Sequence, residues 1–232
     1  MAKKRIYGQF CPVAIGAEVF ANKWTPLLLR ELMAGSRRFG QLRKGVPLMS
    51  RSLLAQRLRE LTYAGLVKAK PLKNGNGSEY FLTDAGEALR PLVIGLGEWA
   101  QDWLGPKIRD YDLDPGLLMW DIQRNVDVAL LPPSPRTIVE FQLAGVLAAQ
   151  RLWWLHVEKD TVDLCFAHTG FENDLVVRAH LRDLTEIWMG QLPIPQALAA
   201  GKLTLEGDRK LCQNFPKWFT LSDFAPRAHE IC

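Results

Sequence analysis

Four side chains suited to nucleic-acid recognition lie in one short segment: Arg51, Ser52, Gln56 and Arg59. Arginine pairs with guanine, glutamine with adenine and serine with either, so this segment could read base edges in a major groove. The leucines between them recur at helical spacing and form a stripe on the other side. We therefore predict an amphipathic helix that begins at Ser50, ends near Gly65, and turns its polar face outward.

Two helical elements precede this segment and would position it. Thr25 is a predicted N-cap, followed by Pro26 at the first helical position. An apolar stripe then leads to Gly35, a predicted C-terminal stop. A short segment, residues 39–44, follows. Two short helices joined by a tight turn, the second polar outside, form a helix-turn-helix.

A basic hairpin is predicted directly after the second helix. Residues 66–70 and 79–83 have strand character, and the turn between them contains Asn74-Gly75, a strong hairpin signal. Such a wing would place lysines along the phosphate backbone and fix register without reading sequence. The predicted DNA-contacting residues are, in all, Arg37, Arg38, Ser50, Arg51, Ser52, Gln56, Arg57, Arg59, Lys70 and Lys73.

A last helix of this half, capped by Thr83, carries an apolar seam at alternating spacings of four and three, which suits pairing between two subunits. Pro91, Gly95 and Gly97 interrupt it, so a bent or broken helix is expected. Packing of the seam on its own domain is the alternative. The predicted dimerisation residues are Leu89, Leu92, Leu96, Trp99 and Trp103.

The charge is divided unevenly along the 232 residues. Residues 1–110 hold 18 Lys and Arg against 9 Asp and Glu, whereas the rest hold 11 against 16. A basic half joined to an acidic half suggests that the first half meets a polyanion, although chance could produce the same split. No apolar run is long enough for a membrane span or signal peptide, so a cytoplasmic protein without a membrane partner is expected. Four cysteines far apart make a disulfide framework or zinc site unexpected.

Linked motifs over residues 7–104 resemble the HxlR family of winged helix-turn-helix regulators, relatives of the MarR group. They include Cys11-Pro12-Val13, Lys23-Trp24-Thr25, Arg37 to Leu42, Gln56 to Leu61 and Tyr80 to Gly86. The resemblance implies a homodimer on a pseudo-palindromic operator in double-stranded DNA. Some members of that family sense oxidants through the cysteine of the first motif, which makes Cys11 a candidate sensor, with an inert structural role as the alternative.

The second half reads as an α+β domain after a polar linker, residues 110–116. Helices are expected at 117–131, 181–192 and 194–200 and after residue 208. Strands are expected at 137–143, 151–157, 162–167, 174–179 and 202–208. Strands with helices grouped after them suggest a sheet covered on one face. The predicted domains are thus 1–110, a mostly helical winged helix-turn-helix, and 117–232.

This tail resembles the sterol-carrier-protein-like fold, through residues 201–208 and 215–219 above all. The resemblance implies an apolar cavity for a hydrophobic effector. Aromatic side chains at these spacings could equally be core. The candidate ligand-binding residues are Trp153, Trp154, Phe166, Trp188 and Trp218.

Enzyme signatures are missing from the sequence: there is no P-loop, GxSxG, HExxH or dinucleotide fingerprint. His156, His168 and His180 could form a metal site, but no carboxylate or cysteine lies beside them at ligand spacing. We therefore expect no catalytic residue, metal or cofactor, and a homodimeric DNA-binding regulator whose operator affinity an apolar effector modulates. A redox regulator using Cys11 with a tail for assembly or protein interaction is the alternative. A lipid carrier or enzyme whose helix-turn-helix serves assembly is a third.

Overall fold

The computed structural model describes residues 7–73, 75–104, 108–168 and 170–225, in two compact units, Met1–Trp99 and Ala100–Cys232. The basic stretch from Lys3 to Arg5, the turn residue Asn74 and Cys232 lie outside the described residues. The expected linker, residues 110–116, lies within the second unit. There Arg182 holds it by donating to the Ile108 carbonyl at 2.9 Å and pairing with Asp110 at 2.5 Å.

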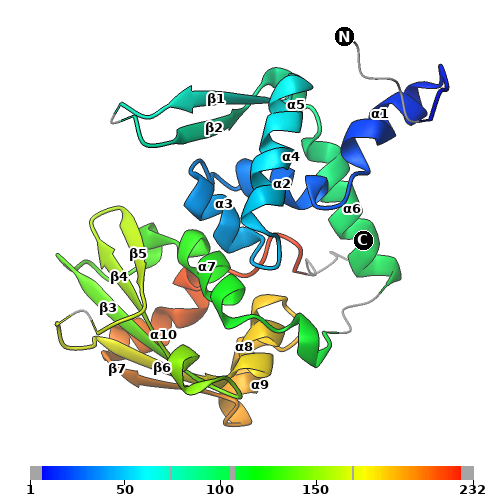
Figure 1. Ribbon diagram of the computed structural model, residues 1–232. Helices are drawn as coiled ribbons and strands as arrows, with labels where there is room; N and C mark the ends of the chain where they lie inside the picture. The colour runs from blue at the N-terminus through cyan, green and yellow to red at the C-terminus, as the bar shows by residue number, and fades with distance from the viewer. Residues whose placement is uncertain (1–6, 74, 105–107, 169, 226–232) are drawn as a thin grey trace. The chain divides into compact units, whose positions relative to one another are not determined.

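The first unit is a set of helices with one hairpin, as the sequence predicts (Figure 1). Its elements are α1 (Pro12–Phe20), α2 (Thr25–Met33), α3 (Phe39–Gly45), α4 (Arg51–Tyr63), β1 (Val67–Pro71), β2 (Ser78–Leu82), α5 (Asp84–Glu87) and α6 (Arg90–Trp103), which runs past the division between the units.

The start of α2 differs from the prediction. Trp24, not Thr25, is the N-cap, with φ of 77°, and Thr25 is the first helical residue. Thr25 is fully buried, and its hydroxyl has no hydrogen-bond partner among the described residues. Trp24 begins the helix instead, because the Trp24 carbonyl accepts a hydrogen bond from the Leu28 N–H at 3.0 Å. The predicted stop is confirmed, since Gly35 has φ of 92° directly after the C-cap.

The helix-turn-helix and the hairpin are confirmed. The Ser50 hydroxyl caps α4 by accepting from the Leu53 N–H at 3.3 Å, and the stripe Leu54, Leu58 and Leu61 is buried. Strands β1 and β2 pair antiparallel from Val67↔Leu82 to Pro71↔Ser78, one residue displaced from the predicted ranges. Buried side chains of α2, α3 and α4 meet in one core with Val67, which holds the three helices and the wing in a fixed arrangement.

The last helix of this half is broken, as expected, but ahead of Pro91. Thr83 caps α5 by accepting from the Gly86 N–H at 3.2 Å, and α5 ends at Glu87. Gly95 and Gly97 lie inside α6. Pro91 falls in the first turn of α6, where its missing N–H leaves no helical hydrogen bond unmade.

The second unit is a five-stranded mixed sheet with helices, in the strand order β5-β4-β3-β6-β7. All neighbours are antiparallel except β3 and β6, which are parallel, so the chain between β5 and β6 crosses over the sheet. Its elements are η1 (Asp110–Asp112), α7 (Pro115–Asn125), η2 (Val128–Leu130), β3 (Thr137–Ala144), η3 (Ala148–Gln150), β4 (Leu152–Glu158), β5 (Thr161–Cys165), β6 (Leu175–His180), α8 (Leu181–Trp188), α9 (Ile194–Ala199), β7 (Leu203–Gly207) and α10 (Arg209–Trp218).

Two predicted helices are too long. The helix expected at 117–131 ends at Asn125, because Val126 turns extended and forms a bridge with Phe219. The helix expected at 181–192 ends at Trp188, and Gly190, with φ of 72°, follows it. The first of these helix ends depends on Phe219, which is distant in sequence, and the second depends on Gly190, a single glycine with positive φ within an apolar run.

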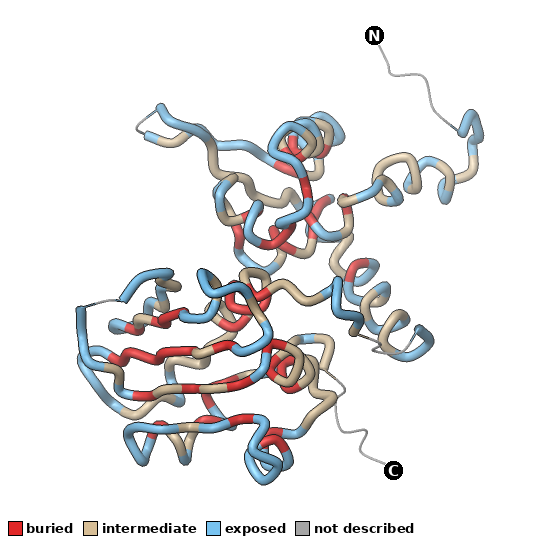
Figure 2. Tube along the Cα trace, turned by 60° about the horizontal axis from the view of Figure 1, so that its bottom comes forward, coloured by how far each residue is buried: buried red, intermediate tan, exposed pale blue. Residues whose placement is uncertain are grey.

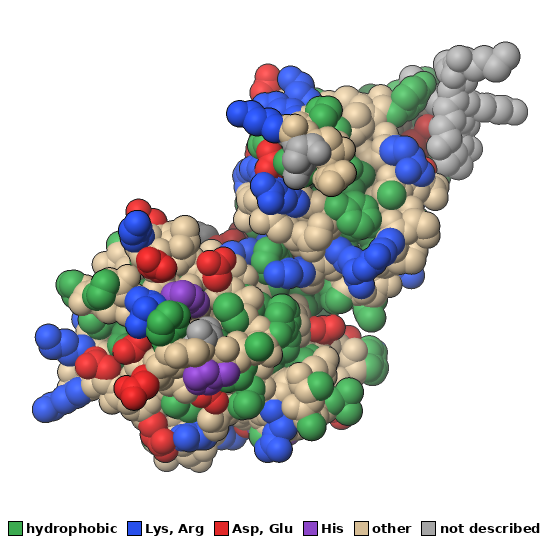
Figure 3. Space-filling view, turned by 60° about the vertical axis from the view of Figure 1, so that its left-hand side comes forward, with side chains coloured by type: hydrophobic (Ala, Val, Ile, Leu, Met, Phe, Trp, Pro, Cys, Tyr) green, Lys and Arg blue, Asp and Glu red, His purple; other side chains and the backbone are tan. Residues whose placement is uncertain are grey.

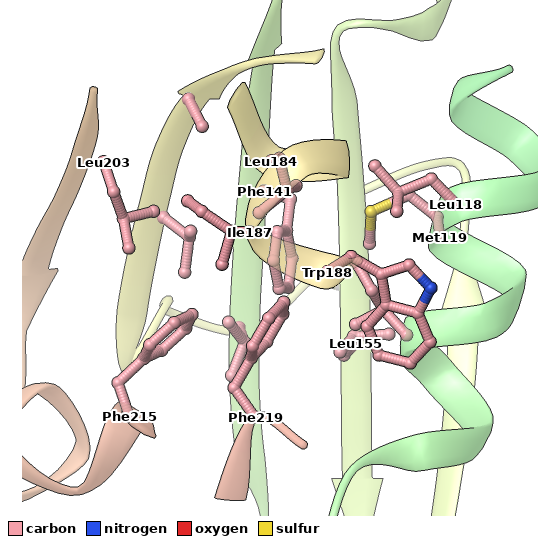
Figure 4. Close-up of a cluster of buried hydrophobic side chains, with 14 of the residues drawn as sticks. Leu118, Met119, Phe141, Leu155, Leu184, Ile187, Trp188, Leu203, Phe215 and Phe219 are labelled. Atoms are coloured by element: carbon pink, nitrogen blue, oxygen red, sulfur yellow. The ribbon is translucent and has the colours of Figure 1, made fainter. Parts of the chain in front are cut away.

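The core of the second unit lies between one face of the sheet and its helices (Figure 4). Phe215 and Phe219 stack with centroids 4.7 Å apart, and Phe215 meets Trp218 edge-on at 4.9 Å. Phe141 of β3 lies opposite them, and Trp188 of α8 points toward α7. The expectation of a sheet covered by helices on one face is confirmed.

Candidate DNA interface and ligand groove

The polar face of α4 is exposed. Arg51, Ser52, Gln56 and Arg59 are all exposed, while the leucine stripe on the other side is buried. The amide of Gln56 also donates to Glu60 at 3.0 Å, which leaves its oxygen free to accept. Ser50 uses its hydroxyl in the cap, so its part is to set where the helix begins.

Arg57 does not join this face. Its position on α4 falls beside the buried stripe, and its side chain is 14% exposed. The guanidinium pairs with Glu60 at 2.5 Å. The structure thus separates Arg57 from the other predicted residues of the helix.

Arg37 and Arg38 lie against the wing. The Tyr80 N–H donates to the Arg37 carbonyl at 2.8 Å, and Arg38 forms an antiparallel bridge with Glu79. Residues 37–38 therefore pair with β2 like a very short third strand. The Arg37 guanidinium donates to the Leu32 carbonyl at 2.6 Å, whereas Arg38 is 63% exposed. Of the two, Arg38 is the more exposed, and its guanidinium pairs with Glu79 at 3.4 Å on the surface of the wing.

The wing presents basic side chains on its surface. Lys70 and Lys73 are exposed, and the Lys70 ammonium lies 4.7 Å from the centroid of Phe81. Lys68 is exposed on the same face of β1 as Lys70 and was missed by sequence reasoning. The two-residue spacing of these lysines in a predicted strand was the signal that could have found it. Lys and Arg side chains gather on this unit in Figure 3.

Helices α1 and α6 carry apolar faces that their own unit leaves open. None of the residues of α1, all described, is buried (Figure 2). Val13 of α1 is 78% exposed, and Phe10, which precedes the helix, is 95% exposed. Val93 is the one buried residue among the described residues of α6. Four of the predicted dimerisation residues, Leu92, Leu96, Trp99 and Trp103, are exposed, and Leu89 is half-buried.

Cys11 is a free, partly exposed thiol at the N-cap of α1, and its side chain makes no capping bond. Cys165 and Cys212 are also free and partly buried. Burial, followed by the negative charge of Asp208, raises the pKa of the Cys212 thiol, which makes it a poor thiolate.

The five candidate aromatic residues do not share one site. Trp153, Trp188 and Trp218 are buried in the helix-covered core. Trp154 pairs across to Glu140 and lies on the opposite face of the sheet, with its ring 5.8 Å from that of His168. Phe166 is 65% exposed, and its ring centroid lies 5.0 Å from that of Trp153, which belongs to the core.

The opposite face of the sheet holds a groove of about 780 Å³. Glu140 and Gln142 of β3, Arg178 and His180 of β6 and Leu152 of β4 line it, and Lys202 and Asp183 stand at one side. A chain of hydrogen bonds crosses this face, from Asn173 to Glu140, from Gln142 to Glu140 at 2.8 Å, and from Arg178 to Gln142 at 2.7 Å. Figure 3 shows charged, histidine and hydrophobic side chains mixed over this unit.

The three histidines make separate contacts. His168 contacts Trp154, His156 contacts Phe171, and His180 accepts from the Arg182 N–H at 3.3 Å. Within the described ranges, no group of three or more His, Cys, Asp or Glu side chains is placed to hold a metal ion.

No helix in the described part of the chain is both long and apolar enough to cross a membrane.

Comparison with known families finds one match in each half of the chain. Residues 19–108 match the family described as HxlR-like helix-turn-helix, and residues 136–220 match the SCP-2 sterol transfer family.

Relatives of this chain are named as regulators. The HTH-type transcriptional regulator YvaP of Bacillus subtilis is 32% identical over 104 residues, covering 44% of this chain and 96% of that protein. The HTH-type transcriptional regulator Rv3095 of Mycobacterium tuberculosis is 38% identical over 141 residues, 55% of this chain and 87% of that protein. A solved structure of the redox regulator HypR in its reduced form is 30% identical, covers 40% of this chain and 92% of that chain, and has a TM-score of 0.38. The chain therefore belongs to the HxlR-like helix-turn-helix family of transcriptional regulators, which are not enzymes, and residues 136–220 of its C-terminal half match the SCP-2 sterol transfer family.

Proposed function

We propose that the protein is a homodimeric regulator that binds a pseudo-palindromic operator with α4 of each subunit in a major groove. The observation that carries this proposal is the exposed face of Arg51, Ser52, Gln56 and Arg59 on a helix whose other face is fully buried. Lysines of the wing, with Arg38, would contact phosphates and hold the register. Such a protein acts where the chromosome is, which agrees with the expected cytoplasmic location.

Dimerisation is supported by the open apolar faces of α1 and α6. Contiguous apolar side chains exposed on a helix are costly in water, and a second subunit would cover them. The exposed seam of Leu92, Leu96, Trp99 and Trp103 is the part of α6 that a partner would bury. Two recognition helices held in this way would read two half-sites related by two-fold symmetry.

The C-terminal domain would sense a small molecule with a large apolar part. The match to a sterol transfer family supports this assignment. The effector changes operator affinity only if it binds the DNA-competent and the incompetent dimer with different affinity.

A second candidate keeps DNA binding and removes the effector. The helix-covered core is filled by stacked aromatic rings, which favours a tail that serves assembly or protein interaction. Cys11, a partly exposed thiol, would then be the sensor. A C11S variant that keeps the full oxidant response of operator binding would remove this candidate.

The experiment is selection of duplex DNA from a random pool by the full-length protein, followed by anisotropy titration at several salt concentrations. We expect an enriched sequence with two-fold symmetry, two chains per duplex, and affinity that falls steeply with salt. Recovery of no enriched motif, together with binding independent of salt, would overturn the proposal.

A further inference from the structure

We propose that the groove on the helix-free face of the C-terminal sheet is the ligand site of this domain, and that it takes an organic cation with an apolar body. This inference deepens the proposed function, on which it rests for its regulatory meaning, by naming the site and the ligand chemistry. It places the ligand on the face opposite the aromatic core, which is filled by rings in mutual contact.

The groove is the uncovered half of that face. The segment between β5 and β6 crosses the sheet and covers the other half, with His168 on Trp154 and Phe171 on His156. Beyond this cover, the ends of β3 and β6 and the start of β4 are open, which leaves the volume of about 780 Å³. The groove therefore results from a crossover segment that stops short of the end of the sheet.

Glu140 supplies the negative charge at the border between the covered and open halves. It is 7% exposed, and it lines the groove. Its carboxylate accepts from the amides of Gln142 and Asn173, and it makes no ion pair with a Lys, Arg or His among the residues that the structure describes. A carboxylate has about four acceptor sites, so roughly two remain for a ligand. Because a buried charge without a counter-charge is costly, a cation there would be strongly favoured.

Two of the cations that line the groove are already paired with carboxylates. Arg178 pairs with Glu206 at 2.7 Å and also donates to Gln142, and Lys202 pairs with Asp183 at 2.8 Å. Arg151 is exposed at the rim, where water and salt screen its charge. Glu140 is therefore the desolvated, uncompensated charge that a ligand would meet in the groove.

The third feature is an apolar wall. Ala144, Ala148 and Leu152 line the groove, and Leu152 is 44% exposed although it belongs to a strand. Leu152 pairs directly across to Gln142, so apolar and polar contacts lie side by side. An apolar body could cover Leu152 and the alanines while its positive charge faces Glu140.

The test is calorimetric titration of the full-length protein, without DNA, with tetraphenylphosphonium and with tetraphenylborate. The two ions share shape and apolar surface and differ in the sign of the charge. We expect the cation to bind and the anion to bind at least about tenfold more weakly. Glu140→Gln keeps the size of the side chain and removes its charge, and its one amide oxygen can keep one of the two hydrogen bonds that Glu140 accepts from Gln142 and Asn173. It should weaken cation binding about tenfold or more and leave anion binding unchanged.

Two further variants make the result unambiguous. Glu158→Gln removes an exposed carboxylate at the far end of β4 and should leave cation binding as it is. Ala148→Trp fills the groove from an exposed position and should abolish cation binding with an unchanged melting temperature. Equal binding of the two ions, or cation binding that survives both Glu140→Gln and Ala148→Trp, would overturn the inference. Since no DNA is present, either failure leaves the DNA-binding proposal standing, and loss of operator binding would leave this one standing.

Discussion

Glu31 is a buried carboxylate at the centre of the DNA-binding unit. It is fully buried on α2, pairs with Arg30 at 2.8 Å and accepts from the Ser36 hydroxyl at 3.2 Å. The same Arg30 donates to the Gly45 carbonyl at 3.1 Å, so this polar group ties α2 to the end of α3. Gly45 is required there, because a Cβ at this position would lie 1.9 Å from the Glu31 carboxyl carbon.

Gly45→Ala should therefore destabilise the first unit. Overpacking against a side chain held by an ion pair costs about 1–3 kcal/mol, with the upper end expected here. Urea denaturation followed by circular dichroism measures the loss. Gly40→Ala is the matched control on the same helix: nothing lies within 4 Å of its Cβ, and it should stabilise by up to about 1 kcal/mol. Equal effects of the two substitutions would contradict this packing.

Cys212 should react slowly with alkylating reagents in the folded protein. Its pKa is raised by burial, so at neutral pH less thiolate is present than in the unfolded chain. The rate of iodoacetamide modification, followed by mass spectrometry, should increase as pH rises through the elevated pKa. Protein unfolded in urea is the control and should react faster at each neutral pH. Equal rates in the folded and unfolded chain would show that Cys212 is not protected.

At the scale of elements, α4 and the wing divide their work. In the proposed complex, the exposed face of α4 would discriminate bases, while the wing lysines would supply charge without base-specific geometry. The cap at Ser50 and the buried leucine stripe set the rotation of α4, and hence which residues face outward.

Arg59→Ala should weaken binding to the selected operator by about 1–3 kcal/mol and reduce discrimination against mutated sites. Arg57→Ala is the matched control, since Arg57 has the same charge on the same helix but lies off the exposed face. It should change operator affinity little. Anisotropy titration against operator and unrelated duplex measures both, and a larger loss for Arg57→Ala would reverse our assignment of the face.

Leu96→Glu should separate the subunits. A charge placed in the exposed seam of α6 would have to be desolvated on association, so we expect a shift from dimer to monomer by analytical ultracentrifugation and weaker operator binding. Glu98→Gln lies on another side of α6 and should leave the dimer intact. A dimer that survives Leu96→Glu would move the interface away from this seam.

At the scale of the whole molecule, the chain has two separate cores. The first core lies in unit Met1–Trp99 and includes Leu28, Leu58 and Val67. The aromatic core lies in unit Ala100–Cys232. The two clusters share no residue. Stability is therefore expected to divide between the units.

Phe215→Ala tests this division. Removing a fully buried ring that touches Trp218 and Phe219 should cost the second unit about 3–5 kcal/mol and leave the first unit unchanged. Scanning calorimetry should show one transition lowered and one retained, and operator affinity below the lower transition should stay the same. A single transition lowered as a whole would mean that the units unfold together.

Local sequence signals were sufficient to predict the elements that carry the DNA-binding proposal. The leucine period of α4, its serine cap, the glycine-rich turn of the wing and the Thr83 cap are signals within a few residues of one another. Short-range hydrogen bonds and side-chain periodicity determine such features, so the local amino-acid sequence is sufficient to predict them.

The positions of several key side chains depend on how distant strands and segments pack together. Trp153 and Trp154 are neighbours in sequence but lie on opposite faces of the sheet, which sends one to the core and the other beneath the crossover segment. Glu140 is buried because that segment covers half of a face that strand alternation would leave in water. Pairing between strands and coverage by distant chain determine burial, and no local pattern contains that information.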